Sequence, residues 1–473
     1  MSDACKNENL TSPEFLRKLD DISQSRIREG NHIEFFARGI DSYKKRWELL
    51  ENAKKSIHLV SFSLMNDDTS KRLRDLLIKK LGEGVEVKMV FSDTSLRTSM
   101  SGYIMAEVVK KGGKLYRYND LLQGWVPNLR KGNPFKQLIL NAKLKIKKHF
   151  HEKYFVVDGT YAILGGMNWG DKYANGGDDK YPKSWRDSDL FLQGKVVGDI
   201  QAQFLKDFLR YEHWQQTIAK NMFADYDTVM RECDFRTVDS VREEMPQYFP
   251  EPENSGTAAL RYVAHKPYDD NRLNMTNAML LSMKQAKDYI NWGCHAIRPP
   301  LIVGEYLADA AARGVEVSLI TNSQKSARGL MAHGFFGFMY YECTKHYKWL
   351  LERGVRVFEW QREGAFHSKN LVIDDCLAAV GSYNVAPGST YGHTESQVFI
   401  HGGDMPLKIK EQFHVDFSTC KEVLLDDVKD SLPRANAFDG PLTERDLLIE
   451  PELLTPTVKE KLERGDYKKI FGK

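Results

Sequence analysis

Short apolar runs alternate with longer segments of helical spacing along most of the chain. The stretch GEGVEVKMVFSD (82–93) reads as a helix end, a glycine stop and a β-strand, and ARGVEVSLITNS (312–323) has the same pattern. KKGGKLYRYN (110–119) and LERGVRVFEW (351–360) form a second such pair. Helices that alternate with short Val/Ile/Leu-rich strands are typical of an α/β sandwich. The pattern therefore predicts an α/β fold in which one plan occurs twice.

The two copies divide the chain into halves. Between them, REEMPQYFPEPENSGT is rich in Pro, Glu and polar residues, which is typical of a linker. The last stretch of the chain is charged and contains prolines, and predicts a surface-packed tail with one short helix. The predicted segments are an N-terminal extension (1–30), a first half (31–241), a linker (242–257), a second half (258–430) and a C-terminal tail (431–473).

A polar motif occurs once in each half at the same internal spacing. Lys follows His by two positions, Asp follows it by seven, and Asn follows it by 17. The members are His151, Lys153, Asp158 and Asn168 in the first copy, and His367, Lys369, Asp374 and Asn384 in the second. Small residues precede each Asn and permit a close approach of the backbone. Two copies with identical offsets predict a functional site rather than satisfied core histidines.

The residue types in this motif fit phosphodiester chemistry. On a strand, residues two apart point to one face, so each His lies beside its Lys, and a pseudo-twofold axis would bring both pairs to one cleft. Lysines and asparagine amides would bind phosphoryl oxygens, one imidazole would attack phosphorus, and the other would donate a proton. Since no cluster of carboxylates accompanies them, we expect no metal and no other cofactor. Asp158 and Asp374 are expected to hold the turn after each strand rather than to contact substrate.

The doubled motif, followed by GGxN and GSxN, resembles the phospholipase D superfamily over residues 30–420. WRDSDLFLQG (185–194) and GSYNVAPGSTYGHTES (381–396) resemble stretches of the bacterial cardiolipin synthases. The resemblance implies two homologous phospholipase D-like α/β sandwich halves, related by a pseudo-twofold axis, with one shared active site. It also implies a phosphohistidine intermediate and no metal ion.

The same resemblance implies roles for individual residues. His151 would be the nucleophile and His367 the general acid, although members of the superfamily do not always assign the two roles in this order. Glu395 would orient His367, and Asp189 would be a weaker counterpart in the first half. The chain departs from the synthase pattern at Ala386, Gly388 and His393, which are expected to shape the rim of the pocket. These departures leave the choice of acceptor open.

The leading interpretation is a phosphatidyltransferase that makes cardiolipin from phosphatidylglycerol. A phospholipase D hydrolase that releases phosphatidic acid uses the same residues, and a metal-independent nuclease is a third possibility. A formal charge of only +3 predicts weak attraction to a nucleic acid backbone, so no nucleic acid partner is expected. A non-catalytic scaffold would not need His, Lys and Asn intact in both copies.

Composition adds a cellular setting. Six scattered cysteines without a CxxC pair predict free thiols rather than disulfides or a zinc site. The chain shows no secretory signal and no transmembrane run, so we expect a cytoplasmic protein, peripheral at the inner face of the membrane. The basic and apolar stretch 130–153 fits either an anionic lipid surface or an amphipathic element packed on the core. The expected partner is an anionic phospholipid, and one monomer would suffice for a complete site.

Overall fold

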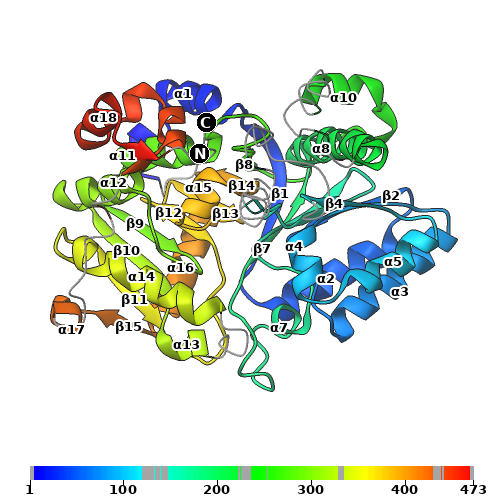
Figure 1. The fold of residues 1–473 in the computed structure, drawn as a ribbon, viewed down its shortest axis with the longest axis horizontal. Coiled ribbons are helices and arrows are strands. Elements are labelled where there is room, and N and C mark those ends of the chain that lie inside the picture. The colour runs from blue at the N-terminus through cyan, green and yellow to red at the C-terminus, as the bar shows by residue number, and fades with distance from the viewer. Residues whose placement is uncertain are drawn as a thin grey trace.

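The computed structural model describes residues 5–119, 148–221, 236–252, 254–328, 335–429 and 441–468, together with residues 133, 139, 224, 229 and 438. Within these residues, fifteen strands form one sheet that runs through two lobes lying side by side (Figure 1). The lobes correspond to the two copies found in the sequence.

The first lobe carries seven of the strands. They are β1 (Arg28–Phe36), β2 (Ser56–Ser61), β3 (Glu86–Ser92), β4 (Lys114–Tyr118), β5 (Tyr154–Val157), β6 (Tyr161–Gly165) and β7 (Asp189–Gln193). Its helices are α2 (Gly39–Asn52), α3 (Asp68–Gly82), α4 (Asp93–Thr98), α5 (Gly102–Lys110), α7 (Asp171–Ala174), α8 (Lys195–Lys220) and α10 (Val238–Glu244). Helix α1 (Pro13–Ser23) precedes them in the chain.

The second lobe repeats this order. Its strands are β8 (Ala258–His265), β9 (Tyr289–Gly293), β10 (Glu316–Asn322), β11 (Arg356–Trp360), β12 (Asn370–Ile373), β13 (Leu377–Gly381), β14 (Glu395–His401) and β15 (Cys420–Val423). Its helices are α11 (Asn274–Lys284), α12 (Leu301–Ala312), α13 (Gln324–Arg328), α14 (Phe335–Leu351), α15 (Pro387–Tyr391), α16 (Met405–Phe417) and α17 (Leu425–Lys429). A short parallel pair, β16 (Leu442–Thr443) and β17 (Tyr467–Lys468), flanks α18 (Pro456–Glu463) near the C-terminus.

The strand order shows the internal symmetry directly. The sheet runs β15-β11-β10-β9-β12-β13-β14-β8-β1-β7-β6-β5-β2-β3-β4. Counted outward from the central antiparallel pair β8–β1, each side meets its strands in the same relative sequence, except that β15 adds one strand to the second lobe. This arrangement confirms the predicted fold class of two homologous α/β halves related by a pseudo-twofold axis.

The glycine stops predicted from the sequence end helices at matching places. Gly84 and Gly314 have φ of +85° and +90°, a left-handed conformation that residues with a Cβ rarely adopt, and they follow α3 and α12. Strands β3 and β10 then begin two residues later and are buried along almost their whole length. Both lie between parallel neighbours, which explains why they read as continuous apolar runs.

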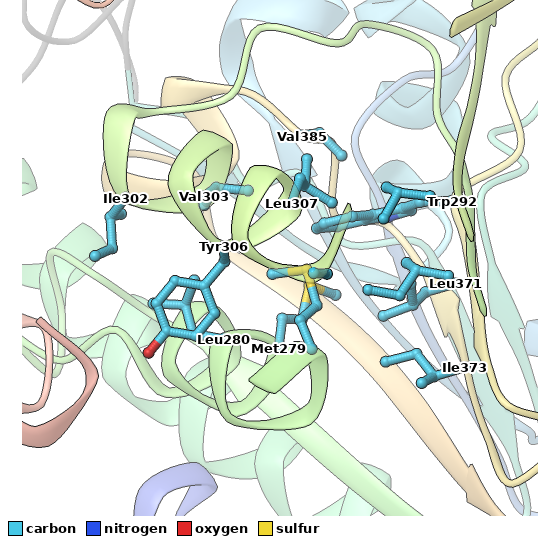
Figure 2. Packing of buried hydrophobic residues seen from close by; sticks show 14 of the residues in the cluster. Met279, Leu280, Trp292, Ile302, Val303, Tyr306, Leu307, Leu371, Ile373 and Val385 are labelled. Carbon is cyan, nitrogen blue, oxygen red and sulfur yellow. The ribbon is translucent and has the colours of Figure 1, made fainter. Parts of the chain in front are cut away.

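Three apolar clusters hold the lobes together. Each lobe has its own cluster on one face of the sheet, and in the second lobe Met279 of α11 and Leu307 of α12 pack towards Leu371 of β12 (Figure 2). A third cluster is shared by the two lobes: it joins Phe204 of α8 to Phe413 of α16. The shared cluster holds the two lobes in a fixed relative position. A site built from residues of both lobes needs such a fixed position.

The N-terminal residues pack on the second lobe rather than the first. Helix α1 lies beside α11 and close to α18 (Figure 1), and Cys5 forms a disulfide with Cys376. The prediction of free thiols is therefore wrong for this pair. A spacing rule looks for neighbouring cysteines, whereas these two are 371 residues apart and meet only because α1 crosses to the other lobe. Cys294, Cys343 and Cys420 are free.

The stretch predicted as a linker is partly structured. Helix α10 ends within it, and a 3-10 helix at Pro246–Tyr248 follows. The Tyr248 hydroxyl donates a hydrogen bond to Glu86 at 2.8 Å, which attaches the stretch to the first lobe. The segment boundaries drawn from the sequence stay a prediction.

Candidate active site

The two His–Lys runs lie immediately before strands β5 and β12, whereas the sequence placed them on the strands. Their backbones form hydrogen bonds to the other lobe: the His151 N–H donates to Thr394 O at 3.0 Å, and the His367 N–H donates to Arg186 O at 2.7 Å. The N–H groups of the two histidines are thus used by the other lobe, whereas pairing within the first lobe extends to Lys153, whose backbone oxygen accepts from the Gly165 N–H at 3.1 Å. These hydrogen bonds between the lobes place both copies of the motif at the boundary between them.

His151 is oriented by a carboxylate from the other lobe. Its Nδ1 lies 2.9 and 3.0 Å from the two carboxylate oxygens of Glu395, the first residue of β14. The Ser382 and Ser389 hydroxyls each donate to Glu395 at 2.5 Å, so the carboxylate is held from both sides. The prediction that Glu395 orients His367 is therefore wrong: Glu395 belongs to the same half as His367 but faces His151.

His367 has the reciprocal arrangement. Its Nδ1 lies 2.6 Å from Asp187 Oδ2, and Asp187 comes from the first lobe, two residues before β7 begins. Asp189, the counterpart named from the sequence, instead forms a buried ion pair with Arg46 at 2.7 Å and accepts a hydrogen bond from Ser42. Asp187, not Asp189, is the residue that the sequence interpretation missed.

Strand register contains the signal that identifies Asp187. Gly165 is paired with Asp189 in the β6–β7 ladder, and Gly381 is paired with Gln397 in the β13–β14 ladder. Asp187 and Glu395 stand two residues before these partners and so occupy equivalent positions. Counting from the paired strands, rather than from the histidines, would have found the second carboxylate.

Gly166 is required by the approach of this carboxylate. A Cβ at Gly166 would lie 2.1 Å from Asp187 Oδ1, a distance that atoms in contact do not reach. The second copy has Ser382 at the matching position, and its hydroxyl donates to Glu395.

We expect Gly166→Ala to displace Asp187 and to lower the rate of any reaction that needs an oriented His367, by roughly 10- to 1000-fold, because a misplaced catalytic group is costly. Steady-state turnover, measured beside the thermal unfolding midpoint, checks this. Gly102→Ala is a matched control, since nothing lies within 4 Å of a Cβ there. Unchanged turnover in folded Gly166→Ala protein would contradict the role of Asp187.

The two lysines and the two histidines are all buried together. Lys153 Nζ donates to the backbone oxygen of His151, and Lys369 Nζ donates to that of His367. Burial lowers the pKa of Lys153 to about 7 and also lowers the pKa of Lys369. Burial, followed by the nearby lysine charges, holds the pKa of both imidazoles well below the ordinary value.

The carboxylates shift in the opposite direction. Desolvation raises the pKa of Asp187 to about 7 and that of Glu395 to about 7. Each is within hydrogen-bonding distance of an imidazole Nδ1, so each His–carboxylate pair can hold one proton near neutral pH and leave Nε2 of the imidazole with its lone pair. An imidazole in this state can attack an electrophile or exchange a proton.

The two asparagines differ in how far they are committed to protein contacts. Asn168 Oδ1 accepts from the Ser63 N–H at 2.9 Å, and its Nδ2 donates to the Tyr173 hydroxyl at 2.8 Å. Asn384 Oδ1 is buried and has no partner within the described part of the chain. Ser389 links Asn384 to the site, because it accepts from the Asn384 N–H and donates to Glu395. Asn384 therefore has the more available amide for a ligand.

Asp158 and Asp374 are placed at the far ends of β5 and β12 from the histidines. Asp158 accepts hydrogen bonds from three backbone N–H groups, at Lys54, Lys55 and Ser56, over 2.7–2.9 Å. Asp374 does the same for Lys287, Asp288 and Tyr289. Both have positive φ, at 55° and 52°. These hydrogen bonds hold the turn after each strand and do not involve the imidazoles. The sequence predicts this role for both aspartates.

We expect Asp158→Ala to lower the free energy of unfolding by about 1–3 kcal/mol, since three hydrogen bonds to a charged acceptor are lost. Turnover by the folded fraction should stay within about twofold of the original value. Urea unfolding and single-concentration rate assays check both numbers. Asp158→Asn keeps one acceptor oxygen and tolerates the positive φ, so its free energy of unfolding should lie between those of the original protein and of Asp158→Ala. A stable Asp158→Ala protein without activity would instead place Asp158 in the chemistry.

Aromatic and imidazole rings surround the two central histidines. Phe62 and His393 lie 4.9 and 5.4 Å from the His151 ring, centroid to centroid. Trp185 and His295 lie 5.2 and 5.1 Å from the His367 ring. The rings displace water, which accounts for the desolvation that dominates every pKa shift in the site.

The basic stretch predicted to contact either lipid or the core lies almost wholly outside the described residues. Of residues 130–153, all but 133, 139 and 148–153 lie outside the described residues.

Two parts of the chain, residues 47–208 and 279–420, match the family model described as cardiolipin synthase, phospholipase D-like domain. A cardiolipin synthase of Oceanobacillus iheyensis is 25% identical over 389 residues, which cover 82% of this chain and 69% of that protein. One of Listeria welshimeri is 26% identical over 391 residues, 82% of this chain and 70% of the relative. The cardiolipin synthase 2 of Staphylococcus epidermidis is 26% identical over 383 residues, 81% and 67% of the two chains.

A solved structure matches along nearly the whole chain. The crystal structure of phosphatidylserine synthase from Haemophilus influenzae aligns with a TM-score of 0.57, covering 95% of this chain and 97% of that one. At 13% sequence identity, the similarity shows that the fold is shared.

Proposed function

This chain belongs to the family of cardiolipin synthase, phospholipase D-like domains, and on that premise we propose that it transfers a phosphatidyl group from one phosphatidylglycerol to another. The observation that carries the proposal is the crossed pairing in the site: each imidazole is bonded through Nδ1 to a buried carboxylate of the other lobe. Such pairs provide two Nε2 atoms, one to attack phosphorus and one to move a proton.

In the first step, Nε2 of His151 attacks the phosphorus of the donor lipid. The bond between phosphorus and the headgroup oxygen breaks, and His367 gives its proton to that oxygen, so glycerol leaves. The product is a phosphatidyl group bonded to His151. A bound phosphodiester brings a negative charge, which raises the pKa of His367 and lets the His367–Asp187 pair hold the proton that is needed.

In the second step, a hydroxyl of an acceptor lipid attacks the same phosphorus. His367 accepts the hydroxyl proton, the P–N bond to His151 breaks, and cardiolipin leaves. Lys153 and Lys369, whose chains are fully buried around the two imidazoles, would stabilise the charge that grows on the phosphoryl oxygens. The amide of Asn384 would add a further contact to the substrate.

Lys369 supports the choice of His151 as the nucleophile. Its Nζ lies 2.9 Å from His367 Nδ1 and competes with Asp187 for that nitrogen, whereas His151 Nδ1 is bonded to the carboxylate of Glu395 alone among the contacts recorded for the described residues. His151 is therefore the imidazole whose Nε2 is more consistently left with a lone pair.

We propose that the protein acts on anionic phospholipid at a membrane surface, on the cytoplasmic side. None of the helices in the described residues is long and apolar enough to cross a bilayer. The disulfide between Cys5 and Cys376 is of a kind that is rare in cytosolic proteins. Asn7, which donates to Asp374 at 2.6 Å and to Gln285 O at 2.8 Å, would hold the same contact without it. Both imidazoles come from one chain, so a monomer is proposed to be sufficient.

Mass spectrometry of the lipids formed from phosphatidylglycerol vesicles tests the proposal. Cardiolipin and glycerol in equal amounts are the expected products. Phosphatidic acid in place of cardiolipin would mean that water is the acceptor and that the protein is a hydrolase. An unchanged lipid mixture would contradict both the transferase and the hydrolase. Incubation of the protein with a plasmid, followed by a check for strand cleavage, would then test the nuclease alternative.

A further inference from the structure

A third imidazole lies beside His151 and has no role in the steps above. The His393 ring is 5.4 Å from the His151 ring, and its Nδ1 is 3.9 Å from Glu395 Oε1. That Nδ1 is buried and makes no hydrogen bond to any described residue. A buried polar atom without a partner is costly unless something else binds it.

Gly388 provides the space for this imidazole. A Cβ at Gly388 would lie 2.6 Å from His393 Cε1, and the His393 N–H donates to Gly388 O at 2.7 Å. Gly388 and His393 are both positions at which the sequence departs from the synthase pattern that it resembles. The two departures thus act together: the glycine allows the imidazole to reach Glu395.

The combination places two imidazoles and one carboxylate around one point. The ligand atoms of His151, His393 and Glu395 lie within 4.8 Å of one another. Ligands on a shared Zn²⁺, each 2.0–2.1 Å from the ion, would lie about 3.3 Å apart, so the most distant ligand atoms must approach one another by up to about 1.5 Å. The half-buried His393 side chain can supply this movement, since it is the least buried of the three.

We propose that His151, His393 and Glu395 form a binding site for a divalent transition metal, of which Zn²⁺ is the best fit, and that the bound metal blocks the reaction. Two imidazoles and one carboxylate, with water in the fourth position, form a ligand set that suits Zn²⁺. The metal would take the place of the hydrogen bond between His151 Nδ1 and Glu395, which orients the nucleophile. Inhibition rests on the proposed function, whereas binding does not.

Zinc binding is measured directly by calorimetry, or by competition with a chromophoric chelator, on full-length protein without a histidine tag. We expect one Zn²⁺ per chain and at least an approximately 100-fold loss of affinity in His393→Asn, because loss of a ligand exceeds the effect of losing a supporting contact. Gly388→Ala should also weaken binding, since its Cβ displaces the ring while all three ligands remain. His414→Asn, at an exposed histidine, is the matched control and should bind as the original protein does.

Equal zinc affinity in the original protein and in His393→Asn would overturn the proposal, as would the absence of saturable binding in the original protein. A second measurement separates this outcome from failure of the proposed function. Lipid turnover should fall with added Zn²⁺ in the original protein, recover with EDTA, and be at least about 10-fold less sensitive to Zn²⁺ in His393→Asn. Zinc binding without any lipid turnover would leave the metal site standing and remove only the phosphatidyltransferase.

Discussion

Replacing His151 by Ala is expected to lower lipid turnover by at least about 10⁴-fold, because the covalent route is lost with its nucleophile. The side chain contacts Glu395 and the surrounding rings but is not part of an apolar cluster, so the fold should persist. Turnover of phosphatidylglycerol vesicles, followed by mass spectrometry, gives the ratio. His414→Ala serves as the control for loss of an exposed histidine and should leave the rate unchanged.

Residual activity within about tenfold of the original, in protein with an unchanged unfolding midpoint, would contradict the assignment of His151 as nucleophile.

His367→Ala should also be severely impaired, but through a different step. With a donor lipid whose leaving group is p-nitrophenolate, no proton donor is needed for departure. His367→Ala should then still release one equivalent of nitrophenolate rapidly and stall, whereas His151→Ala should release none.

The second large effect concerns the carboxylates that cross between the lobes. Glu395→Gln is expected to lower turnover by about 10³-fold, since an amide cannot accept and hold the Nδ1 proton of His151 as a carboxylate does. Asp187→Asn should have an effect of similar size through His367. Asp189→Asn is the matched comparison within the same stretch: it weakens the ion pair with Arg46 and should mainly lower stability. Rates and urea midpoints of the three variants separate orientation from folding.

The pH dependence gives these variants a second readout. Burial raises the pKa of Glu395 to about 7 and that of Asp187 to about 7, and the reaction needs both carboxylates ionised before substrate binds. Activity should therefore rise as pH increases towards 7 and fall as pH drops below it. Glu395→Gln should show a shallower acid limb, because only one of the two groups still titrates. An acid limb of unchanged steepness in both variants would show that neither carboxylate controls the profile.

The doubled motif predicted most of the fold, since identical offsets after each His are what two halves with the same strands and turns would produce, and the strand order repeats in both lobes. The β3 and β10 runs and their glycine stops lie where the apolar pattern placed them. The pairing of each imidazole with a carboxylate of the other lobe could not be predicted from the sequence. Glu395 follows His367 in the same half, and nothing in the spacing shows that its side chain would reach His151 instead.

The contents of the site show the same limit. Asn168 and Asn384 have the same offset, yet Asn168 is held by Ser63 and Tyr173 while Asn384 is not. These partners come from segments without a motif, so their contacts depend on packing. Cys5 and Cys376 meet for a similar reason, because α1 packs on α11 of the second lobe. Local pattern fixes the elements, and tertiary packing decides which side chains meet.

The central claim is that one site, built from both lobes, forms a covalent phosphatidyl adduct on His151. The direct measurement is peptide mass spectrometry of protein mixed with the nitrophenyl donor lipid and quenched at alkaline pH, where a P–N bond survives. We predict a phosphatidyl adduct on the peptide that contains residue 151, accumulating in His367→Ala and absent from His151→Ala. An adduct on the peptide that contains residue 367, or no adduct under conditions of rapid turnover, would contradict the account.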